Sequence, residues 1–243
     1  PGTYTFEIVD IKKIVTICKK HNLISIIDNT WATAIYLNPI NFGVDIVIEA
    51  VTKYISGHSD IMMGAVVANG ENLNAIERWT KNSGICVSPD DIYLSLRGMR
   101  TLPGRLKQSS DNSIAVAQYL EQLSEVKYVL HPALEQHPDH KLWKKDFKGA
   151  SGIFAIEFHD NIPLDAVDKL ADNCEIFGLG ASWGGYSSLL SMMDISESRD
   201  IETSYVPSGV YLRIYTGSEN ITDLINDLEK GFKELRNYLK IIE

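Results

Sequence analysis

The sequence has few cationic residues for its number of acidic ones. Its 243 residues include 23 Lys and Arg against 32 Asp and Glu, which gives a formal net charge of −9. A surface with this excess of negative charge repels nucleic-acid phosphates and anionic lipid headgroups. We therefore expect neither a nucleic acid nor a membrane surface to be a partner of this protein.

Long hydrophobic runs are also missing. The longest apolar stretches, such as residues 61–68, are far shorter than the roughly 20 residues that a membrane-spanning helix needs. The sequence contains neither an internal repeat nor a low-complexity tract, and 44% of its residues are hydrophobic while 23% are charged. This balance supplies enough apolar side chains for a core and predicts a soluble globular fold.

Cysteine is rare. Cys18, Cys86 and Cys174 lie far apart, without the spacing of a metal or redox site. An odd number of separated cysteines fits reduced thiols better than a disulfide framework, so we expect a cytoplasmic protein. The sequence begins at Pro1 without an initiator Met and without the features of a signal peptide. We therefore expect the chain to be a segment of a longer protein.

Hydrophobic periodicity predicts an α/β arrangement in the first part of the chain. Residues 9–20 have the period of an amphipathic helix with basic residues at its end. Three short apolar runs follow and read as buried strands, at residues 23–27, 45–51 and 61–68. A helix and three strands indicate a sheet whose functional loops gather at one edge.

The second part of the chain has a different pattern. A long helix is predicted over residues 89–125, with strands at 153–158 and 211–215 and helices at 164–173 and 221–238. This mixture is typical of a separate, smaller α+β domain. We place the boundary near residues 98–104, which divides the chain into domains 1–99 and 100–243. The polar stretch 194–208 is the best candidate for a loop or lid.

Two polar side chains follow the predicted strands and suggest a chemistry. Asp28 ends the first strand and Lys53 follows the second, so both are expected at the same edge of a parallel sheet. Burial lowers the pKa of a lysine and makes its amine a nucleophile able to form a Schiff base. Asp28 could pair with a cationic ring nitrogen, and Thr52 could bind a phosphate, which together are what pyridoxal phosphate requires. On spacing alone, an aspartate in a turn and a solvated lysine are the more common interpretation.

Two other motifs carry weaker alternatives. His131, His137 and His140 have a spacing that could hold zinc, but Pro132 and Pro138 mark a loop and no second ligand cluster is present. We therefore expect no metal site. The glycines between residues 178 and 185 do not have the spacing or the strand–helix context of a dinucleotide-binding loop.

Four motifs favour the cofactor-binding interpretation of Asp28 and Lys53. They are IDNTWAT at residues 27–33, AVTKYISGHSD at 50–60, SLRGMRTL at 95–102 and SWGGY at 182–186. In order and spacing these motifs resemble the Cys/Met-metabolism family of pyridoxal-phosphate-dependent enzymes. Within that family the sequence is most similar to the bacterial cystathionine β-lyases, because Trp31 and Trp183 replace the Phe and Leu that are usual in the γ-lyases and γ-synthases.

The resemblance implies a fold and a cofactor. The fold is the aspartate-aminotransferase type, fold type I, of which the chain covers about the last three fifths. Domain 1–99 would be the C-terminal part of the large cofactor-binding domain, and domain 100–243 the small C-terminal domain. The missing N-terminal part supplies the tyrosine that stacks on the cofactor and a glycine-rich phosphate site in this family. We therefore expect the segment alone neither to hold pyridoxal phosphate tightly nor to turn over.

The resemblance also implies roles for individual residues. Lys53 matches the lysine that binds the cofactor covalently and acts in catalysis, Asp28 the carboxylate on the pyridine nitrogen, and Thr52 a phosphate-binding hydroxyl. Ser182 and Trp183 match the loop on the substrate side. Arg213 matches the arginine that binds the substrate α-carboxylate, a task suited to a planar guanidinium; without the family, an ordinary strand arginine in a surface ion pair is the simpler interpretation.

The activity implied by the resemblance is the α,β-elimination of L-cystathionine to homocysteine, pyruvate and ammonia, a step of methionine biosynthesis by transsulfuration, in a cytoplasmic homotetramer. Ala181 and Lys81 stand where close β-lyases have tyrosines, so another small sulfur amino acid such as cysteine stays open as the substrate. Cysteine-S-conjugate β-lyase, cystathionine γ-lyase and cystathionine γ-synthase activities are alternatives within the family. A non-catalytic fragment of a split or decayed gene is the alternative outside it.

Overall fold

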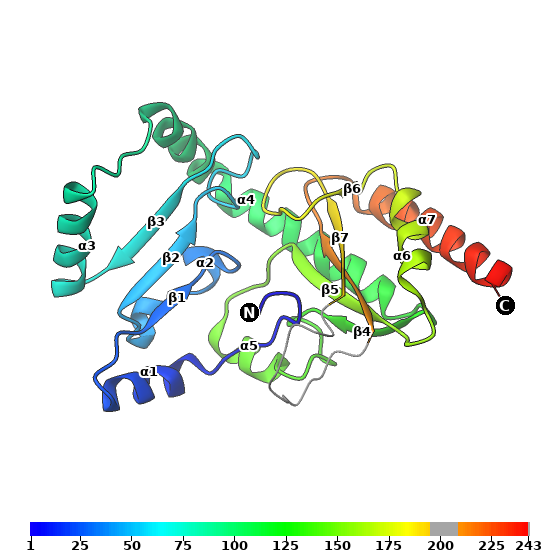
Figure 1. Ribbon diagram of the computed structural model, residues 1–243, viewed down its shortest axis with the longest axis horizontal. Coiled ribbons are helices and arrows are strands. Elements are labelled where there is room, and N and C mark those ends of the chain that lie inside the picture. The colour runs from blue at the N-terminus through cyan, green and yellow to red at the C-terminus, as the bar shows by residue number, and fades with distance from the viewer. Residues whose placement is uncertain (195–208, 243) are drawn as a thin grey trace.

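The computed structural model describes residues 1–194 and 209–242 and contains two β-sheets joined by a long helix (Figure 1). A three-stranded sheet belongs to the first part of the chain and a five-stranded sheet to the second. Residues 195–208, which make up almost all of the predicted loop or lid, lie outside the described residues. Within the described residues, no helix is both long and apolar enough to cross a bilayer.

The first sheet has the strand order β1-β2-β3. Strand β1 (Ile26–Asp28) pairs in parallel with β2 (Ile46–Ala50), as the prediction of a common carboxyl edge requires. Strand β3 (Gly64–Ala68) pairs with β2 in the antiparallel direction. The short elements around this sheet are α1 (Ile11–Lys20), α2 (Thr33–Tyr36), the 3₁₀ helix η1 (Pro39–Phe42) and α3 (Gly70–Asn82).

Helix α1 begins two residues later than its hydrophobic pattern predicts, because Asp10 caps it. The Asp10 side chain accepts a hydrogen bond of 3.1 Å from the backbone N–H of Lys13, which satisfies one of the donors left free in the first turn. Lys19 and Lys20 occupy the last turn, where positive charge is favourable. The cap and the basic end together fix both limits of the helix.

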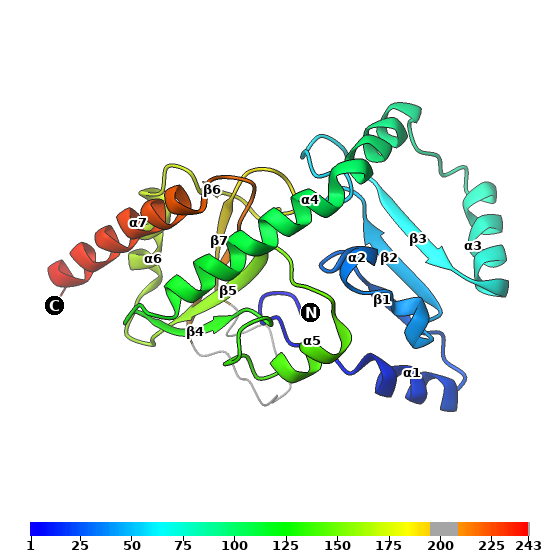
Figure 2. The same cartoon turned by 180° about the vertical axis from the view of Figure 1, so that it is seen from behind.

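Helix α4 (Pro89–Leu120) is 32 residues long and runs from the three-stranded sheet to the five-stranded sheet, as both ribbon views show (Figures 1 and 2). It begins at the Ser88 side chain, which accepts a hydrogen bond from the Asp90 N–H, and Pro89 fits the first turn because proline lacks an N–H. The helix continues through Pro103. The proposed division between residues 99 and 100 therefore lies inside one helix, and the domain limits stay a prediction.

The second sheet has the strand order β4-β5-β8-β7-β6. Two of its helices begin at the predicted residues 164 and 221, whereas the helix at 140–146 and the strands at 126–130, 178–179 and 189–194 were not predicted. Its strands are β4 (Val126–Leu130), β5 (Ile153–Phe158), β6 (Gly178–Leu179), β7 (Leu189–Asp194) and β8 (Val210–Tyr215). Its helices are α5 (His140–Asp146), α6 (Leu164–Asp172) and α7 (Ile221–Ile242). All of the pairs except β6 with β7 are antiparallel.

Alternation along β8 separates two cores. Leu212 and Ile214 point to one face and pack with α4, α6 and α7 in the larger hydrophobic cluster. Tyr211 and Tyr215 point to the opposite face and pack with side chains from the first part of the chain, such as Tyr54. Because side chains alternate along a strand, Arg213 must lie on this second face, between the two sheets.

One face of the three-stranded sheet is exposed. A sheet of this family that lacks its first strands is expected to expose an apolar face, and here Ile26 is 60% exposed, Ile48 39% and Val66 48%. These residues lie on one face because Ile48 pairs with Val66, and Ile26 lies two residues before the partner of Ile48. No layer of the described residues covers this face, so apolar side chains selected for burial meet solvent there.

Candidate active site

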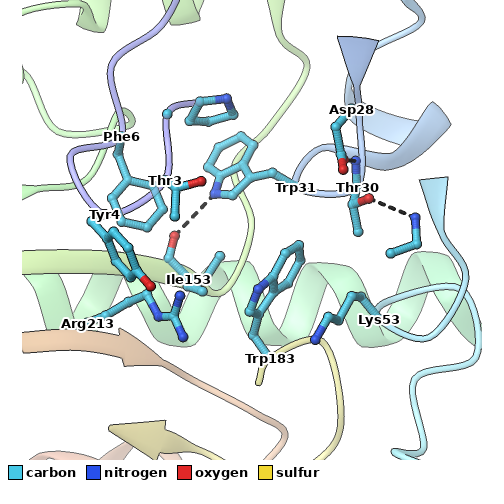
Figure 3. Close-up of a pocket in the computed structure, with 13 residues that line it drawn as sticks. Thr3, Tyr4, Phe6, Asp28, Thr30, Trp31, Lys53, Ile153, Trp183 and Arg213 are labelled. Carbon is cyan, nitrogen blue, oxygen red and sulfur yellow. Dashed lines mark hydrogen bonds between the residues drawn. The ribbon is translucent and has the colours of Figure 1, made fainter. Parts of the chain in front are cut away.

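Asp28 and Lys53 meet at the carboxyl edge of the parallel pair β1 and β2. Strand β1 ends at Asp28, strand β2 ends at Ala50, and Lys53 lies in the turn that follows. Both residues line one cavity of about 300 Å³ between the two sheets (Figure 3). The residues that line this cavity are Pro1, Gly2, Thr3, Tyr4, Phe6, Asp28, Thr30, Trp31, Ala50, Lys53, Ile153, Trp183 and Arg213.

The Lys53 amine is held by the loop that carries Ser182 and Trp183. Its Nζ atom donates a hydrogen bond of 2.9 Å to Ser182 Oγ and lies 5.5 Å from the centre of the Trp183 ring. Burial lowers the pKa of Lys53, and the positive charge of Arg213 lowers it further. A lower pKa makes the unprotonated, nucleophilic amine more abundant at neutral pH.

Gly184 lets this loop approach the Lys53 backbone closely. It has φ +85°, and a Cβ atom at this position would lie 2.8 Å from Lys53 Cα. Any larger residue would therefore be strained by its backbone conformation and would push the loop away from the lysine. Glycine at position 184 is what brings Ser182 within hydrogen-bond distance of Lys53.

The Asp28 carboxylate is oriented by the turn after β1. Its Oδ1 atom accepts a hydrogen bond of 2.9 Å from the Thr30 N–H, and Thr30 Oγ1 accepts one of 2.8 Å from the Ala50 N–H. These bonds connect the ends of β1 and β2 and fix the direction of Asp28 relative to the strand that leads to Lys53. Asp28 thus presents its carboxylate at the cavity on a rigid support.

Arg213 reaches the cavity from β8, on the opposite side from Asp28 (Figure 3). It is only 8% exposed, its Nη2 atom donates to the Ala181 carbonyl at 2.6 Å, and its guanidinium lies 5.1 Å from the centre of the Tyr4 ring. Burial lowers the pKa of Arg213, and Tyr4 partly offsets this. A buried guanidinium beside a cavity is suited to binding a carboxylate.

Aromatic rings form the walls between these charged groups. Trp31 is 7% exposed and donates from Nε1 to the Ile153 carbonyl at 3.2 Å. The Trp183 ring packs on Tyr54, with 5.5 Å between the ring centres. Two tryptophans therefore border the space between Lys53 and Arg213, and they provide the apolar lining that a flat ring would need.

Thr52 is a predicted site residue that does not line this cavity. Its Oγ1 atom donates to the Met63 carbonyl at 3.2 Å and accepts from the Met63 N–H at 2.9 Å. These bonds tie the turn after β2 to the residue before β3. A role for Thr52 in phosphate binding requires its hydroxyl to donate elsewhere, and that role stays a prediction.

Sequence reasoning missed Tyr4 and Glu49. Tyr4 has φ 70°, a strained conformation for an aromatic residue, and no signal in the sequence points to its place over Arg213.

Glu49 is 6% exposed, and Asn29 Nδ2 donates to its Oε1 at 3.0 Å. Burial raises its pKa to about 7, and the nearby Asp28 also raises it. A glutamate inside the apolar run of a predicted strand was the available signal.

Each of the three histidines considered as a zinc ligand has a hydrogen-bond partner within the protein. His131 is fully buried, its Nε2 lies 3.0 Å from Ser113 Oγ, and burial lowers its pKa to about 3. His140 Nδ1 lies 3.0 Å from the Pro132 carbonyl oxygen. Across residues 1–194 and 209–242 there is no group of three or more His, Cys, Asp or Glu arranged to hold a metal ion.

The cavity fits pyridoxal phosphate in the chemistry that it offers. It contains a lysine amine of lowered pKa, a fixed carboxylate, a buried guanidinium and two tryptophan walls. Its volume of about 300 Å³ is at the lower limit of small-molecule pockets. Lys53 and Asp28 line this cavity, and Thr52 does not.

Comparisons with known proteins agree with this chemistry. The model of the Cys/Met metabolism PLP-dependent enzyme family matches residues 1–233. The chain is 43% identical over 236 residues to an L-alanine/L-glutamate racemase of Wolbachia pipientis, covering 97% of this chain and 58% of the racemase. It is also 43% identical over 236 residues to a putative cystathionine beta-lyase of Rhizobium johnstonii, covering 96% of this chain and 59% of the relative.

A solved structure is similar throughout the chain. Cystathionine gamma synthase from Xanthomonas oryzae pv. oryzae, in complex with aminoacrylate and cysteine, superposes with a TM-score of 0.87 and 32% identity, covering 98% of this chain and 62% of that one. The predicted fold type I is therefore confirmed. The chain spans about three fifths of the length of the relatives that it matches.

Proposed function

The chain belongs to the Cys/Met metabolism PLP-dependent enzyme family, and we propose that it carries the catalytic lysine and the substrate-binding arginine of a carbon–sulfur lyase. The proposed reaction is the α,β-elimination of L-cystathionine, with water, to homocysteine, pyruvate and ammonia. The single observation that carries the proposal is the cavity shared by Lys53, Asp28 and Arg213. The relatives named cystathionine beta-lyase, such as that of Haemophilus influenzae at 38% identity, support the choice of reaction.

The proposed roles follow from the chemistry of each side chain. Bound pyridoxal phosphate supplies a reactive aldehyde and a ring that stabilises negative charge at the substrate Cα. Asp28 keeps a proton on the ring nitrogen, and the Thr52 hydroxyl exchanges its bond to Met63 for one to the phosphate. Arg213 binds the substrate α-carboxylate through two parallel hydrogen bonds.

Lys53 moves the protons in this proposal. Its amine removes the substrate α-proton as general base and returns a proton to the sulfur of the leaving homocysteine as the Cβ–S bond breaks. The hydrogen bond to Ser182 holds the amine at the cavity wall, and the lowered pKa favours the form that accepts a proton. Trp183 excludes water from the side of the amine.

A second candidate function is amino-acid racemisation. The observation that favours it is the 43% identity to a protein named L-alanine/L-glutamate racemase. Racemisation begins with the same removal of the α-proton by Lys53, but the substrate has no leaving group at Cβ and the proton returns to Cα. The two functions thus differ in the substrate side chain rather than in the base.

One experiment separates these functions in the full gene product that contains this chain. The protein is incubated with pyridoxal phosphate and L-cystathionine, and pyruvate and free thiol are measured. Parallel incubations use cysteine, a cysteine S-conjugate, L-alanine and L-glutamate, with chiral chromatography for the D-amino acids. Pyruvate with one equivalent of thiol from cystathionine supports the lyase. D-alanine or D-glutamate without pyruvate supports the racemase, and no product from any substrate supports a non-catalytic remnant.

Assembly and compartment belong to the same proposal. Cys18, Cys86 and Cys174 are all free thiols, which suits a reducing compartment such as the cytoplasm. Exposed apolar side chains, among them Met62 at 90% and Trp79 at 62%, lie on the first part of the chain and suit burial in a homo-oligomer. We propose a cytoplasmic homotetramer, which size-exclusion chromatography with light scattering would test.

A further inference from the structure

Arg105 binds the turn that carries Lys53 but does not line the cavity. Its guanidinium donates to the Tyr54 carbonyl at 2.9 Å and to the Ile55 carbonyl at 3.3 Å. It also donates to the Gly98 carbonyl at 2.8 Å, and Nε donates to Thr101 Oγ1 at 3.0 Å. All four acceptors are backbone or hydroxyl oxygens, so this half-buried guanidinium holds backbone and hydroxyl groups rather than a carboxylate.

The carbonyls that Arg105 binds belong to a tight turn that needs such a donor. The turn is closed by hydrogen bonds from Ser56 N–H to the Val51 carbonyl, 2.9 Å, and from Gly57 N–H to the Lys53 carbonyl, 2.8 Å. The Tyr54 and Ile55 carbonyls lie at the end of this turn, where carbonyl groups lack partners within the turn itself. A basic side chain is a common donor to such terminal carbonyls.

Helix α4 lies against the same turn at Gly98. A Cβ atom at this position would be 2.4 Å from both the Ile55 and the Ser56 carbonyl oxygens. Backbone atoms cannot move aside as the end of a flexible side chain can, so any side chain at position 98 must push the turn away from the helix. Gly98 and Arg105 are both on α4, and they fix the distance between this helix and the turn.

The far side of the turn is fixed by Tyr54. Its hydroxyl accepts a hydrogen bond of 2.8 Å from the Gly152 N–H, and its ring packs on Trp183. Lys53 therefore lies next to a residue held by Gly152, just before β5, and to carbonyls held by α4. The Nζ atom extends from this backbone to Ser182, and a shift of about 1 Å in the support of a catalytic group can cost roughly a hundredfold in rate.

We propose that Arg105 is a positioning residue for Lys53, and that with Gly98 it makes helix α4 the support that places the lysine amine in the cavity. This inference rests on the proposed role of Lys53. Arg105 acts through the backbone at residues 54 and 55 and touches neither substrate nor cofactor. The fork of the guanidinium reaches two carbonyls at once, which the single ammonium group of a lysine does less well.

The test uses two matched pairs of substitutions on one helix, made in the full gene product. Arg105→Gln is paired with Arg100→Gln, since Arg100 is exposed on α4. Gly98→Ala is paired with Gly104→Ala, since no atom lies within 4 Å of a Cβ at position 104. Alanine favours helices over glycine at both sites, so a purely local effect on the helix would stabilise both alanine variants alike.

The main readout is the covalent capture of pyridoxal phosphate on Lys53. Borohydride fixes the bound cofactor, and mass spectrometry of the Lys53 peptide measures the rate of fixation as a function of pH. We expect Arg105→Gln and Gly98→Ala to slow fixation about tenfold or more and to shift its pH dependence upward, toward that of an ordinary lysine. Arg105→Lys should recover part of the rate, and both controls should stay within about twofold of the unmodified protein.

The outcomes distinguish this inference from the proposed function. If the unmodified protein shows no fixation of pyridoxal phosphate on Lys53, both the proposed function and this inference are wrong. If Lys53 is fixed normally, and both Arg105→Gln and Gly98→Ala match their controls in rate and pH dependence, only the role of Arg105 is overturned. Should Arg105→Gln fold poorly by circular dichroism, the comparison of Gly98→Ala with Gly104→Ala decides alone.

Discussion

The Nζ atom of Lys53 donates a hydrogen bond of 2.9 Å to the Oγ atom of Ser182, a residue 129 positions later in the chain. This bond joins the turn after β2 to the loop between β6 and β7, and so connects the regions of the two sheets at the cavity. Arg213 comes from a third segment, at the centre of the second sheet. The candidate active site therefore exists only when both sheets are in place.

Substitution of Lys53 should remove both cofactor capture and turnover. We expect Lys53→Ala in the full gene product to lose the visible absorption of bound pyridoxal phosphate and at least about a thousandfold in kcat, because covalent binding and proton transfer both need the amine. Absorption spectroscopy and a pyruvate assay measure these changes. Lys141→Ala, an exposed lysine on α5, is the control, and unchanged kinetics in Lys53→Ala would mean that this lysine is not the base.

Substitution of Arg213 should act mainly on substrate binding. Arg213→Ala removes a guanidinium that is 8% exposed beside the cavity, so we expect KM for L-cystathionine to rise about tenfold to a hundredfold, with a smaller loss in kcat. Steady-state kinetics at saturating cofactor measure the two parameters. Arg78→Ala on the exposed side of α3 should change neither, and a normal KM in Arg213→Ala would assign the arginine to structure alone.

Glu49 should make stability depend on pH. Its folded-state pKa is raised from the usual 4.5 to about 7 by burial and by Asp28, so the folded protein favours the protonated carboxyl. The contribution of Glu49 is complete below pH 4.5 and is lost as the pH rises through about 7, a change of roughly 3 kcal/mol in the free energy of unfolding.

Glu49→Gln isolates this contribution, because the amide keeps the shape of the side chain but does not ionise. Urea unfolding of both proteins at about pH 4.5 and pH 8 gives the difference in unfolding free energy at each pH. We expect this difference to move in favour of Glu49→Gln at the higher pH. A difference that is equal at both values would show that Glu49 does not titrate in the folded protein over this range.

Asp227 should be essential for the stability of the second sheet. It is 1% exposed, and its carboxylate accepts three backbone hydrogen bonds, of 2.9, 2.8 and 3.1 Å, from residues 175, 176 and 177. Asp227→Ala leaves these donors without their acceptor and should lower the free energy of unfolding by about 3 kcal/mol or more. Thermal and urea unfolding measure the loss, and Asp172→Ala at the exposed end of α6 should change stability by less than about 1 kcal/mol.

The 243 residues studied on their own should self-associate and bind pyridoxal phosphate weakly. Ile26, Ile48 and Val66 expose an apolar sheet face, and the chain spans about three fifths of its relatives. Sedimentation velocity and an absorbance titration measure both properties. Threonine at positions 26 and 66 keeps the β-propensity and should reduce self-association without improving cofactor binding. A monomeric chain that releases pyruvate from cystathionine would contradict this expectation.

Local sequence patterns predicted most of the secondary structure because they depend on neighbouring residues. The strand β5 lies where the hydrophobic period places it, α4 begins at the predicted residue 89 but ends at Leu120 rather than at 125, and α1 ends at the predicted residue 20. The pattern did not show that β3 runs antiparallel to β2, because a run of apolar residues has no direction. It also did not identify Ile26 and Ile48 as side chains of the exposed apolar face, because exposure of a given side chain depends on which layers are present.

By itself the sequence determined the family, through four motifs in fixed order, and with it the identity of Lys53, Asp28 and Arg213 as candidates. The parallel register of β1 and β2 could be inferred, since two apolar runs that end in polar residues favour a common edge. Only the tertiary structure decided the contacts of Lys53 with Ser182, of Arg213 with Tyr4 and of Arg105 with the Lys53 turn. The physical reason is that local propensity fixes each segment, whereas the distance between side chains far apart in sequence is set by how the two sheets and helix α4 pack together.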